Sequence, residues 1–321
     1  YQEISSRWGD IRWGLLFERT RNNLLKLEAE LFHPKNWRPI LLALTGSGWT
    51  RPHLPVFGHW LTSGHGILTL AHVVHGEVED HAERQASYEK VLRQFIEREE
   101  LQAFPAVVVA EFLSCGIEGL IQCHGLGGVR PNTVLLGWPA SFSKMAVFGA
   151  NLRLIAQLKR SILAARFLAI RESDSESGNA GPPPDPWDVP EGTIDVWGRG
   201  KQNGPLMLLL AHLLHQNTEW RNNPIRILRL VSNSAAQGEV LTHLQELLTS
   251  SRIDAQPVVV VGDEAGETIR RTSENAAIVM LGFEPPEEGQ ETKVVSNLEQ
   301  LAGDLPRVLF VWSAGGMKLE S

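Results

Sequence analysis

Two short stretches of this chain end in the same way, VLLGW at residues 134–138 and VMLGF at residues 279–283. Each begins with apolar residues, as buried parallel strands do, and each ends in a glycine and an aromatic residue, with a proline soon after. A helical pattern and one further apolar run follow both stretches at matching distances. The repetition predicts a duplicated α/β unit, although a chain of this class can also contain such matches by coincidence.

Short apolar runs alternate with helical patterns around these stretches, which is typical of an α/β fold with a mostly parallel sheet. The first half is predicted to hold five strands, at Ile40–Leu44, Ile67–His72, Ala106–Ala110, Thr133–Leu136 and Ile162–Ala169. The second half is predicted to hold five more, at Thr193–Trp197, Ile225–Val231, Val258–Val261, Ala277–Leu281 and Val308–Trp312. The predicted fold is two similar α/β subdomains, each a five-strand, mostly parallel sheet flanked by helices.

The remaining segments predict how the subdomains are connected. Residues 1–35 contain one long helical pattern, Trp8–Phe32, with no strand partner, and we expect a connector helix there. The first subdomain is expected at residues 36–171 and the second at 192–321. Residues 172–191 combine acidic residues with Ser, Gly and Pro, a composition that favours a linker.

Composition excludes several classes of protein. The 321 residues are 43% hydrophobic and 21% charged, which is ordinary for a folded chain, and no apolar run approaches the roughly 20 residues of a membrane span. A net charge of −7 without a basic tract gives nucleic-acid binding little support. Cys115 and Cys123 lack the spacing of a metal site and suit a reducing cytosol. A start at Tyr1 without a signal-peptide pattern predicts a fragment of a longer protein.

No pattern in the chain predicts a metal site or an enzyme. Five histidines occur close together, but none forms the HxxxH or HExxH pair of a helical metal site. These are His59, His65, His72, His75 and His81. The nearest approach to a nucleophile elbow, at Ser313, lacks its first glycine and has no helix after it. We therefore expect no catalytic residues.

A glycine turn after the first strand suggests a ligand site. Gly46, Ser47 and Gly48 are expected to meet Gly137 and Trp138 at the carboxyl edge of the first sheet, where α/β folds bind ligands. The third glycine of a dinucleotide fingerprint is absent, and so is a P-loop. The sequence predicts at most weak binding of ATP or another adenine nucleotide, with a base stacked on Trp138.

A second glycine turn, GLGG at residues 125–128, resembles the GxxGx9G[ST] motif with which universal stress proteins bind ATP around their fourth strand. Gly125 and Gly128 match the first two positions. Gly137 comes one residue early, and Trp138 stands where the phosphate-binding Ser or Thr would be. The resemblance implies a universal-stress-protein-like fold, while the departures weaken triphosphate binding. A stand-alone nucleotide sensor of that type is the alternative function.

A longer series of motifs resembles the cytosolic C-terminal region of the cation-chloride cotransporters, in the same order from Trp37 to the end of the chain. NTVLLGWP at residues 132–139 is most similar to the K-Cl branch of that family. The other motifs are NWRP at 36–39, GLGG at 125–128, and PEGTIDVW at 190–197 followed by the apolar helix 206–214. The short second half, without the long phosphorylatable insertion of eukaryotic members, resembles prokaryotic ones.

This resemblance implies a regulatory and dimerising domain of a membrane symporter. Such a domain lies at the cytoplasmic face of the cell membrane, attached to its own transmembrane domain. The transmembrane helices carry chloride with potassium, sodium or both, so the ions bind outside this chain. In this family the cytosolic regions of two transporters meet, which implies a homodimer.

The apolar helix of the second half suggests where the dimer forms. Residues 206–211 are apolar on all sides over almost two turns, so one sheet face does not cover them. The predicted interface consists of Trp197, Leu206, Leu209, Leu210, Leu213 and Trp220. The other interpretation is that neighbouring helices of the same half bury this helix.

Overall fold

The computed structural model describes residues 11–30, 33–46, 51–62, 64–168, 185–198, 202–317 and 319, with the backbone alone at residues 80–82. The first half contains α2 (Ile11–Ala29), β1 (Ile40–Leu44), α3 (His53–Thr62), β2 (Ile67–His75), α4 (Val78–Arg98), β3 (Ala103–Ala110), α5 (Leu113–Cys123), β4 (Thr133–Gly137), α6 (Met145–Gln157) and β5 (Ser161–Phe167). The second half contains β6 (Thr193–Trp197), α7 (Gly204–Gln216), β7 (Ile225–Val231), α8 (Gln237–Ser251), β8 (Gln256–Val261), α9 (Ala265–Thr272), β9 (Ala276–Gly282), α10 (Glu291–Ala302) and β10 (Arg307–Trp312). All ten predicted strands are present.

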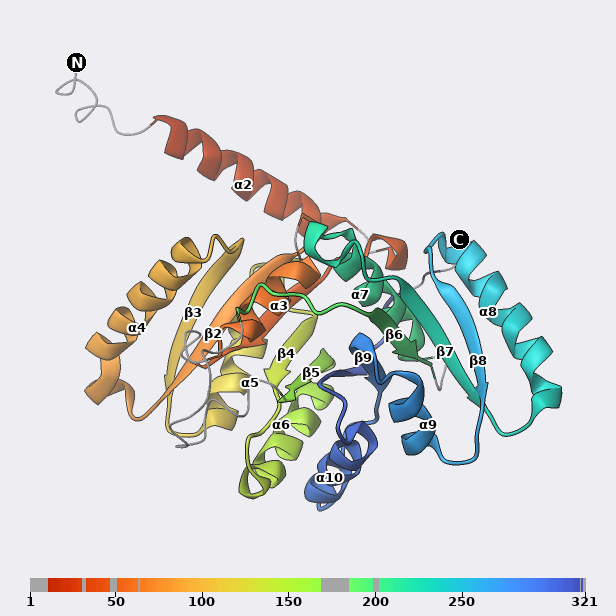
Figure 1. The fold of residues 1–321 in the computed structure, drawn as a ribbon. Helices are drawn as coiled ribbons and strands as arrows, with labels where there is room; N and C mark the ends of the chain where they lie inside the picture. The colour runs from red at the N-terminus through yellow and green to blue at the C-terminus, as the bar shows by residue number, and fades with distance from the viewer. Residues whose placement is uncertain are drawn as a thin grey trace.

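The two halves join into one sheet of ten strands, in the order β3-β2-β1-β4-β5-β10-β9-β6-β7-β8 (Figure 1). Counted within each half, the strand order is the same, which confirms two similar five-strand units. Every pairing is parallel except that of β5 with β10, which is antiparallel. The carboxyl edge of one half therefore lies on the same side as the amino edge of the other.

The two outermost strands, β3 and β8, begin before their predicted first residues, and a proline in each explains the difference. Pro105 lies inside β3 and Pro257 inside β8, and these strands form the two ends of the sheet. Proline cannot donate a ladder hydrogen bond, so within a sheet it is confined mainly to edge strands. In the sequence, a proline inside an apolar run suggests the boundary of a strand. In this structure each proline instead lies inside a strand at the edge of the sheet.

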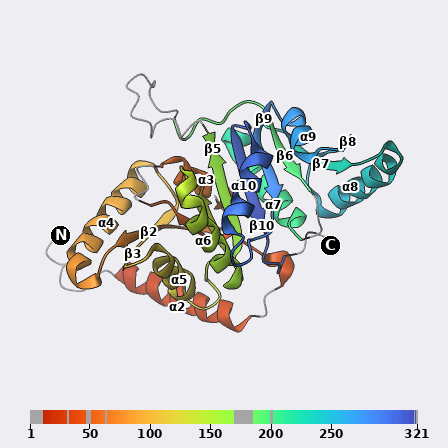
Figure 2. The ribbon, with the colours of Figure 1, turned by 90° about the horizontal axis from the view of Figure 1, so that it is seen from below.

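Helices cover both faces of the sheet (Figures 1 and 2). Buried residues of α3, α4, α7 and α8 form one core with the sheet, and those of α5, α6, α9 and α10 form another on the opposite face. The central strands carry continuous apolar runs because both of their faces are buried; β5, for example, is buried at every residue.

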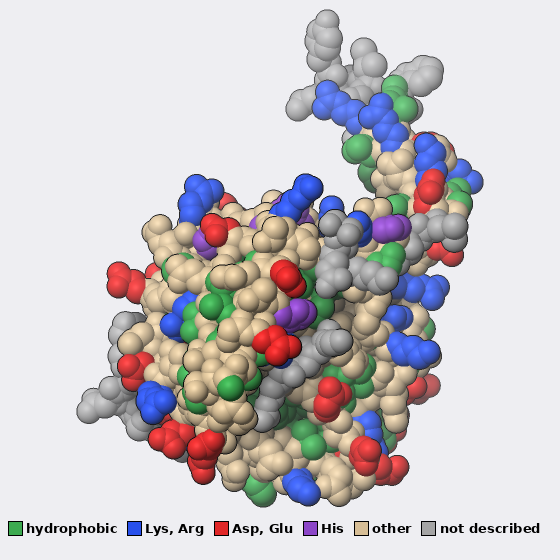
Figure 3. Space-filling model, turned by 90° about the vertical axis from the view of Figure 1, so that its right-hand side faces the viewer, with side chains coloured by type: hydrophobic (Ala, Val, Ile, Leu, Met, Phe, Trp, Pro, Cys, Tyr) green, Lys and Arg blue, Asp and Glu red, His purple; other side chains and the backbone are tan. Residues whose placement is uncertain are grey.

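The expected connector helix is α2, which has no buried residue. Its exposed apolar side chains include Trp13 and Phe17, whose rings stack with centroids 5.4 Å apart. Figure 3 shows this helix projecting from the body, with hydrophobic and basic side chains along it. No helix in the described part of the chain is long and apolar enough to cross a membrane. Most of the expected linker, through residue 184, lies outside the described residues, as do Trp8 and Phe32.

Candidate functional site

The strand order creates a ligand-binding position in the first half. After β1 the chain continues to β2 on one side of the β1–β4 pair, whereas after β4 it continues to β5 on the opposite side. Because the two connections diverge, a crevice opens at the carboxyl ends of β1 and β4. A cavity of about 250 Å³ lies in this crevice. Gly46 follows β1 and Gly137 ends β4, and both line the cavity, as the sequence predicted.

The walls of this cavity are mainly apolar, and its polar side chains include no acidic residue. Those polar side chains are Thr45, Arg51, His72 and Asn151. Thr45 Oγ1 is buried without a hydrogen-bond partner in the described residues, and Asn151 is only 5% exposed. Buried polar atoms are normally paired. The cavity therefore offers hydrogen-bonding groups to a small ligand.

Basic groups from both halves meet beside this cavity. A Cβ atom placed on Gly137 would lie 3.2 Å from Arg51 Nη1, so the guanidinium covers the end of β4. Burial, together with the charges of Arg51 and Arg307, lowers the pKa of His53 to about 3. Arg307 begins β10 and pairs with Phe167 of β5, against which the His53 ring packs at 5.7 Å. Neither arginine forms an ion pair within the described residues, so this edge favours an anion.

Trp138 does not line the cavity. The indole is 5% exposed and packs against Phe148 and Phe310, with centroid distances of 5.2 and 4.8 Å. Its Nε1–H donates to the Glu299 carboxylate of α10. The expectation that Trp138 stacks a base is therefore wrong. At the junction between the halves, Phe148 and Phe310 pack against the ring, and Glu299 accepts the hydrogen bond of Nε1.

The other predicted glycines are divided between two edges of the sheet. Ser47 and Gly48 lie outside the described residues. Gly125 and Gly128 precede β4 at its amino end, so they cannot share a site with Gly137. A Cβ atom on Gly128 would lie 3.3 Å from Leu27 O of α2. This turn contacts the connector helix and lies at the edge opposite Gly137, which corrects the match to the stress-protein motif.

The equivalent crevice in the second half is filled. Asn203, just before α7, donates from Nδ2 to Phe283 O at 3.0 Å and accepts at Oδ1 from Ser313 N at 2.9 Å. A Cβ atom on Gly282, the counterpart of Gly137, would lie 3.1 Å from Asn203 Nδ2 and 3.6 Å from the Met207 methyl carbon. The duplication thus provides two crevices; described residues fill the second, and the first holds a cavity.

The proposed dimer residues are covered by the chain itself. The buried ones are Trp197, Leu206, Leu210, Leu213 and Trp220, and Leu209 is half-buried. Helix α3 of the first half packs beside α7, with the Trp60 and Trp220 ring centroids 5.4 Å apart and Asn217 Nδ2 donating to Trp60 O. The apolar helix therefore needs no second subunit: its cover comes from the other half of the same chain.

Sequence reasoning missed His53, Thr45, Asn151 and Arg307 as site residues. Thr45 and His53 flank the glycine turn after β1, and that adjacency was the available signal. No sequence signal indicated Arg307, because its position beside His53 depends on the antiparallel pairing of β5 with β10.

His53 predicts how stability depends on pH. The unfolded chain titrates this group near pH 6.5, whereas the folded chain binds the proton only near pH 3. The unfolded state thus holds more protons between these values, so stability falls as the pH drops through the window, by at most about 1.4 kcal/mol per unit. Urea unfolding at pH 7 and pH 5 should show a smaller loss for His53→Gln than for the parent chain.

The matched control for this prediction is His243→Gln, on the exposed face of α8. This variant should lose as much stability between pH 7 and pH 5 as the parent chain. Burial also lowers the pKa of His59, His72, His124 and His212, so His53→Gln removes only part of the acid sensitivity. An equal loss of unfolding free energy between pH 7 and pH 5 in the parent and in His53→Gln would contradict the prediction.

Comparisons with known proteins agree with this architecture. The family model described as solute carrier family 12 matches residues 51–147 and 188–308, more than half of the chain and parts of both halves. The crystal structure of the cytoplasmic domain of a prokaryotic cation chloride cotransporter matches with a TM-score of 0.59 at 16% identity, covering 88% of this chain and 98% of that one. A universal stress protein from Archaeoglobus fulgidus DSM 4304 matches with a TM-score of 0.53 at 12% identity, covering 86% and 97%. The two structures are similar to this chain in fold.

Proposed function

Because this chain belongs to solute carrier family 12, we propose that it is the cytoplasmic regulatory domain of a membrane cation-chloride cotransporter. The observation that supports this most is the match of the family model to both halves of the ten-stranded sheet. The solved cytoplasmic domain has the same fold over 98% of its length. The motif NTVLLGWP favours the K-Cl branch, with potassium as the cation moved with chloride by membrane helices outside this chain.

The exposed helix α2 supports an attachment to further protein. It precedes the first strand, projects from the body and leaves Trp13 and Phe17 in contact with solvent (Figures 1 and 3). We propose that α2 follows the last membrane helix and holds the globular part at the cytoplasmic face of the membrane. Exposed apolar patches of this kind mark interaction sites.

The proposed homodimer also uses α2, in place of the buried residues of α7. Leu16 and Leu27 lie on the side of α2 that carries Trp13 and Phe17, and Leu15 lies on another side, so the helix has apolar residues for two surfaces. A second copy of the chain is the partner that we propose for one of them. Light scattering of the purified chain, with a monomer mass of 35.6 kDa, measures this directly.

The cavity beside Arg51 is the proposed effector site of the domain. Its volume of about 250 Å³ is below the usual 300–1,000 Å³ of ligand pockets, so a small anion is the proposed ligand. An adenine nucleotide would extend beyond the cavity, so only weak binding of it is proposed. Apolar walls suit a base, and Arg51 suits a phosphate. The alternative function, a stand-alone nucleotide sensor, is favoured by the same cavity together with the universal-stress-protein-like fold.

One flux experiment tests the proposed function and separates it from the alternative. The gene product that contains this chain would be reconstituted in liposomes, and rubidium uptake would be measured with and without external chloride, and with and without ATP on the side of this domain. We expect chloride-dependent rubidium uptake that changes when residues 36–321 are removed. Absence of chloride-coupled uptake, together with sub-micromolar ATP binding by calorimetry, would favour the nucleotide sensor.

A further inference from the structure

A second and larger groove lies at the opposite edge of the first half. Its volume is about 770 Å³, and it is bounded by the end of α2, the starts of β1 and β2, the turn before β4 and the chain after β10. The lining residues include Glu28, Arg38, His65, Arg130, Asn132 and Gly315. The antiparallel pairing of β5 with β10 brings Gly315 there, because β10 ends where β5 begins.

Asn132 holds the floor of this groove in place. Its Nδ2 donates to Arg38 O at 2.7 Å, and its Oδ1 accepts from Ile40 N at 3.1 Å and from Thr133 Oγ1 at 2.9 Å. Asn132 O accepts from Ser161 N at 2.9 Å, so Arg160, the residue before Ser161, lies next to Asn132 at the start of the neighbouring strand without lining the groove itself. Asn132 therefore joins the segments that carry the three arginines. Its side chain binds the backbone of Arg38, its carbonyl binds the residue after Arg160, and Arg130 lies two residues before it.

Arg130 and Arg160 carry like charges and precede the neighbouring strands β4 and β5. Burial, followed by the charge of Arg130, lowers the pKa of Arg160, and Arg160 Nε is buried with no hydrogen-bond partner in the described residues. Glu28 and Glu30 also line the groove, but no ion pair joins them to these arginines within the described residues. Two close cations with an unpaired buried donor are unfavourable, and a bound anion would reverse that cost.

We propose that this groove binds the phosphate group of a ligand through Arg130 and Arg160, with Arg38 beside them. Guanidinium groups match phosphate oxygens with two parallel hydrogen bonds. A volume of 770 Å³ is in the range of sites for small organic ligands. The site is independent of the cavity beside Arg51, which lies at the other edge of the same strands.

Two sources can supply this chemistry, a soluble phosphate ester and the headgroup of an anionic phospholipid. The test uses the 321-residue chain with three probes: sodium glycerol 1-phosphate in calorimetry, phosphatidylcholine vesicles in flotation, and the same vesicles containing phosphatidylglycerol. We expect binding to phosphatidylglycerol vesicles and none to phosphatidylcholine alone. Binding of glycerol phosphate as well would identify the phosphate group itself as the ligand, and binding to vesicles alone would identify the lipid. Failure of both probes overturns the proposal.

The variant Arg130→Gln/Arg160→Gln should weaken binding about tenfold or more, because each charged hydrogen bond is lost. The matched control is Arg93→Gln/Arg252→Gln, with the same change in net charge on α4 and at the end of α8, and it should bind like the parent. Without ligand, the site variant should be at least as thermally stable as the parent, because the repulsion is gone. If the double variant is destabilised, Arg130→Gln decides the result, since Arg130 is exposed. Parent-like binding by Arg130→Gln would overturn the proposal.

Discussion

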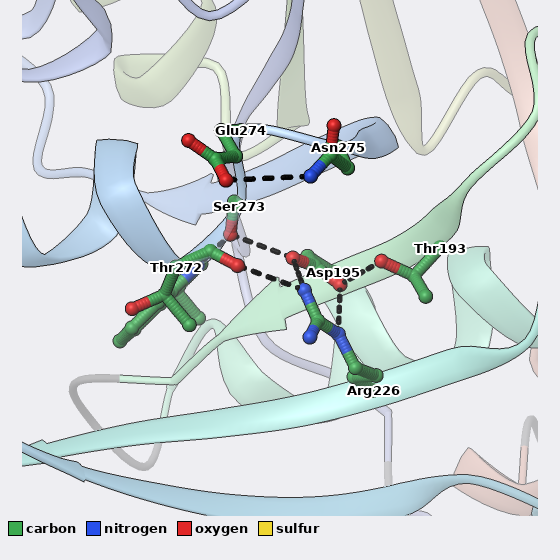
Figure 4. Close-up of polar contacts among 8 residues, drawn as sticks. Thr193, Asp195, Arg226, Thr272, Ser273, Glu274 and Asn275 are labelled. Atoms are coloured by element: carbon green, nitrogen blue, oxygen red, sulfur yellow. Dashed lines mark hydrogen bonds and ion pairs between the residues drawn. The ribbon is translucent and has the colours of Figure 1, made fainter.

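Replacement of Asp195 by alanine is expected to lower the free energy of unfolding by about 3–5 kcal/mol. Asp195 lies on β6 and has no exposed surface. Its two carboxylate oxygens accept from Arg226 Nε at 2.8 Å and Nη2 at 2.6 Å (Figure 4). Thr193 Oγ1 and Ser273 Oγ each donate to it as well, at 2.6 Å. The carboxylate thus ties together β6, β7 and the turn before β9.

The large effect follows from what the substitution leaves behind. Arg226 would lose its counterion, keeping a hydrogen bond to Thr272 O, and Ser273, which accepts from Trp197 Nε1, would lose its own acceptor. Removal of one partner of a buried ion pair costs more than the pair contributes. The Arg226 side chain is 24% exposed, so water would replace only part of the lost carboxylate contact. The cluster lies at the amino edge of the second half, away from the crevice where α/β folds bind ligands, so its role is structural.

Equilibrium unfolding in urea, followed by tryptophan fluorescence, measures this loss. The control is Glu89→Ala, which breaks the exposed Glu89–Arg93 pair on α4 and should cost only about 0.3–0.5 kcal/mol. A double-mutant cycle with Arg226→Met isolates the coupling between the two side chains. A loss below about 1 kcal/mol for Asp195→Ala would contradict the buried-pair argument.

The second large effect is expected at the junction of the two halves. Arg166 of β5, whose side chain is 3% exposed, donates from Nε and Nη2 to Glu299 Oε1 at 3.1 and 3.0 Å. It also donates to Leu305 O and Gly303 O, and the other Glu299 oxygen accepts from Trp138. Glu299→Ala should lower the free energy of unfolding by about 3 kcal/mol, since it leaves a buried guanidinium without its carboxylate.

Glu288→Ala is the control for this prediction. Glu288 lies just before the same helix α10 and contacts Arg153 of α6 at 3.5 Å, but its side chain is 92% exposed. That exposed pair should contribute less than about 1 kcal/mol. Similar unfolding midpoints for Glu299→Ala and Glu288→Ala would show that the junction does not depend on the buried pair.

The sequence alone determined the local elements of this protein. Runs such as Ile40–Leu44 and Thr193–Trp197 became strands with the predicted ends, because apolar runs bounded by turn residues encode a strand buried on both faces. The duplication was visible for the same reason, since Gly137 and Gly282 end equivalent strands. An apolar pattern shows that a face is covered, but it does not show by what.

Only the tertiary structure decided which distant residues meet. The pairing of β5 with β10 joins segments about 140 residues apart, and it places Arg307 beside His53, Trp138 against Phe310, and Gly315 near Arg130. It also brings α3 alongside α7, which removes the need for a second subunit at Leu206 and Trp220. Such contacts are non-local, so no spacing along the chain records them. For that reason the lining of the crevice beyond Gly46 and Gly137, and the groove beside Arg130, could be found only in the fold.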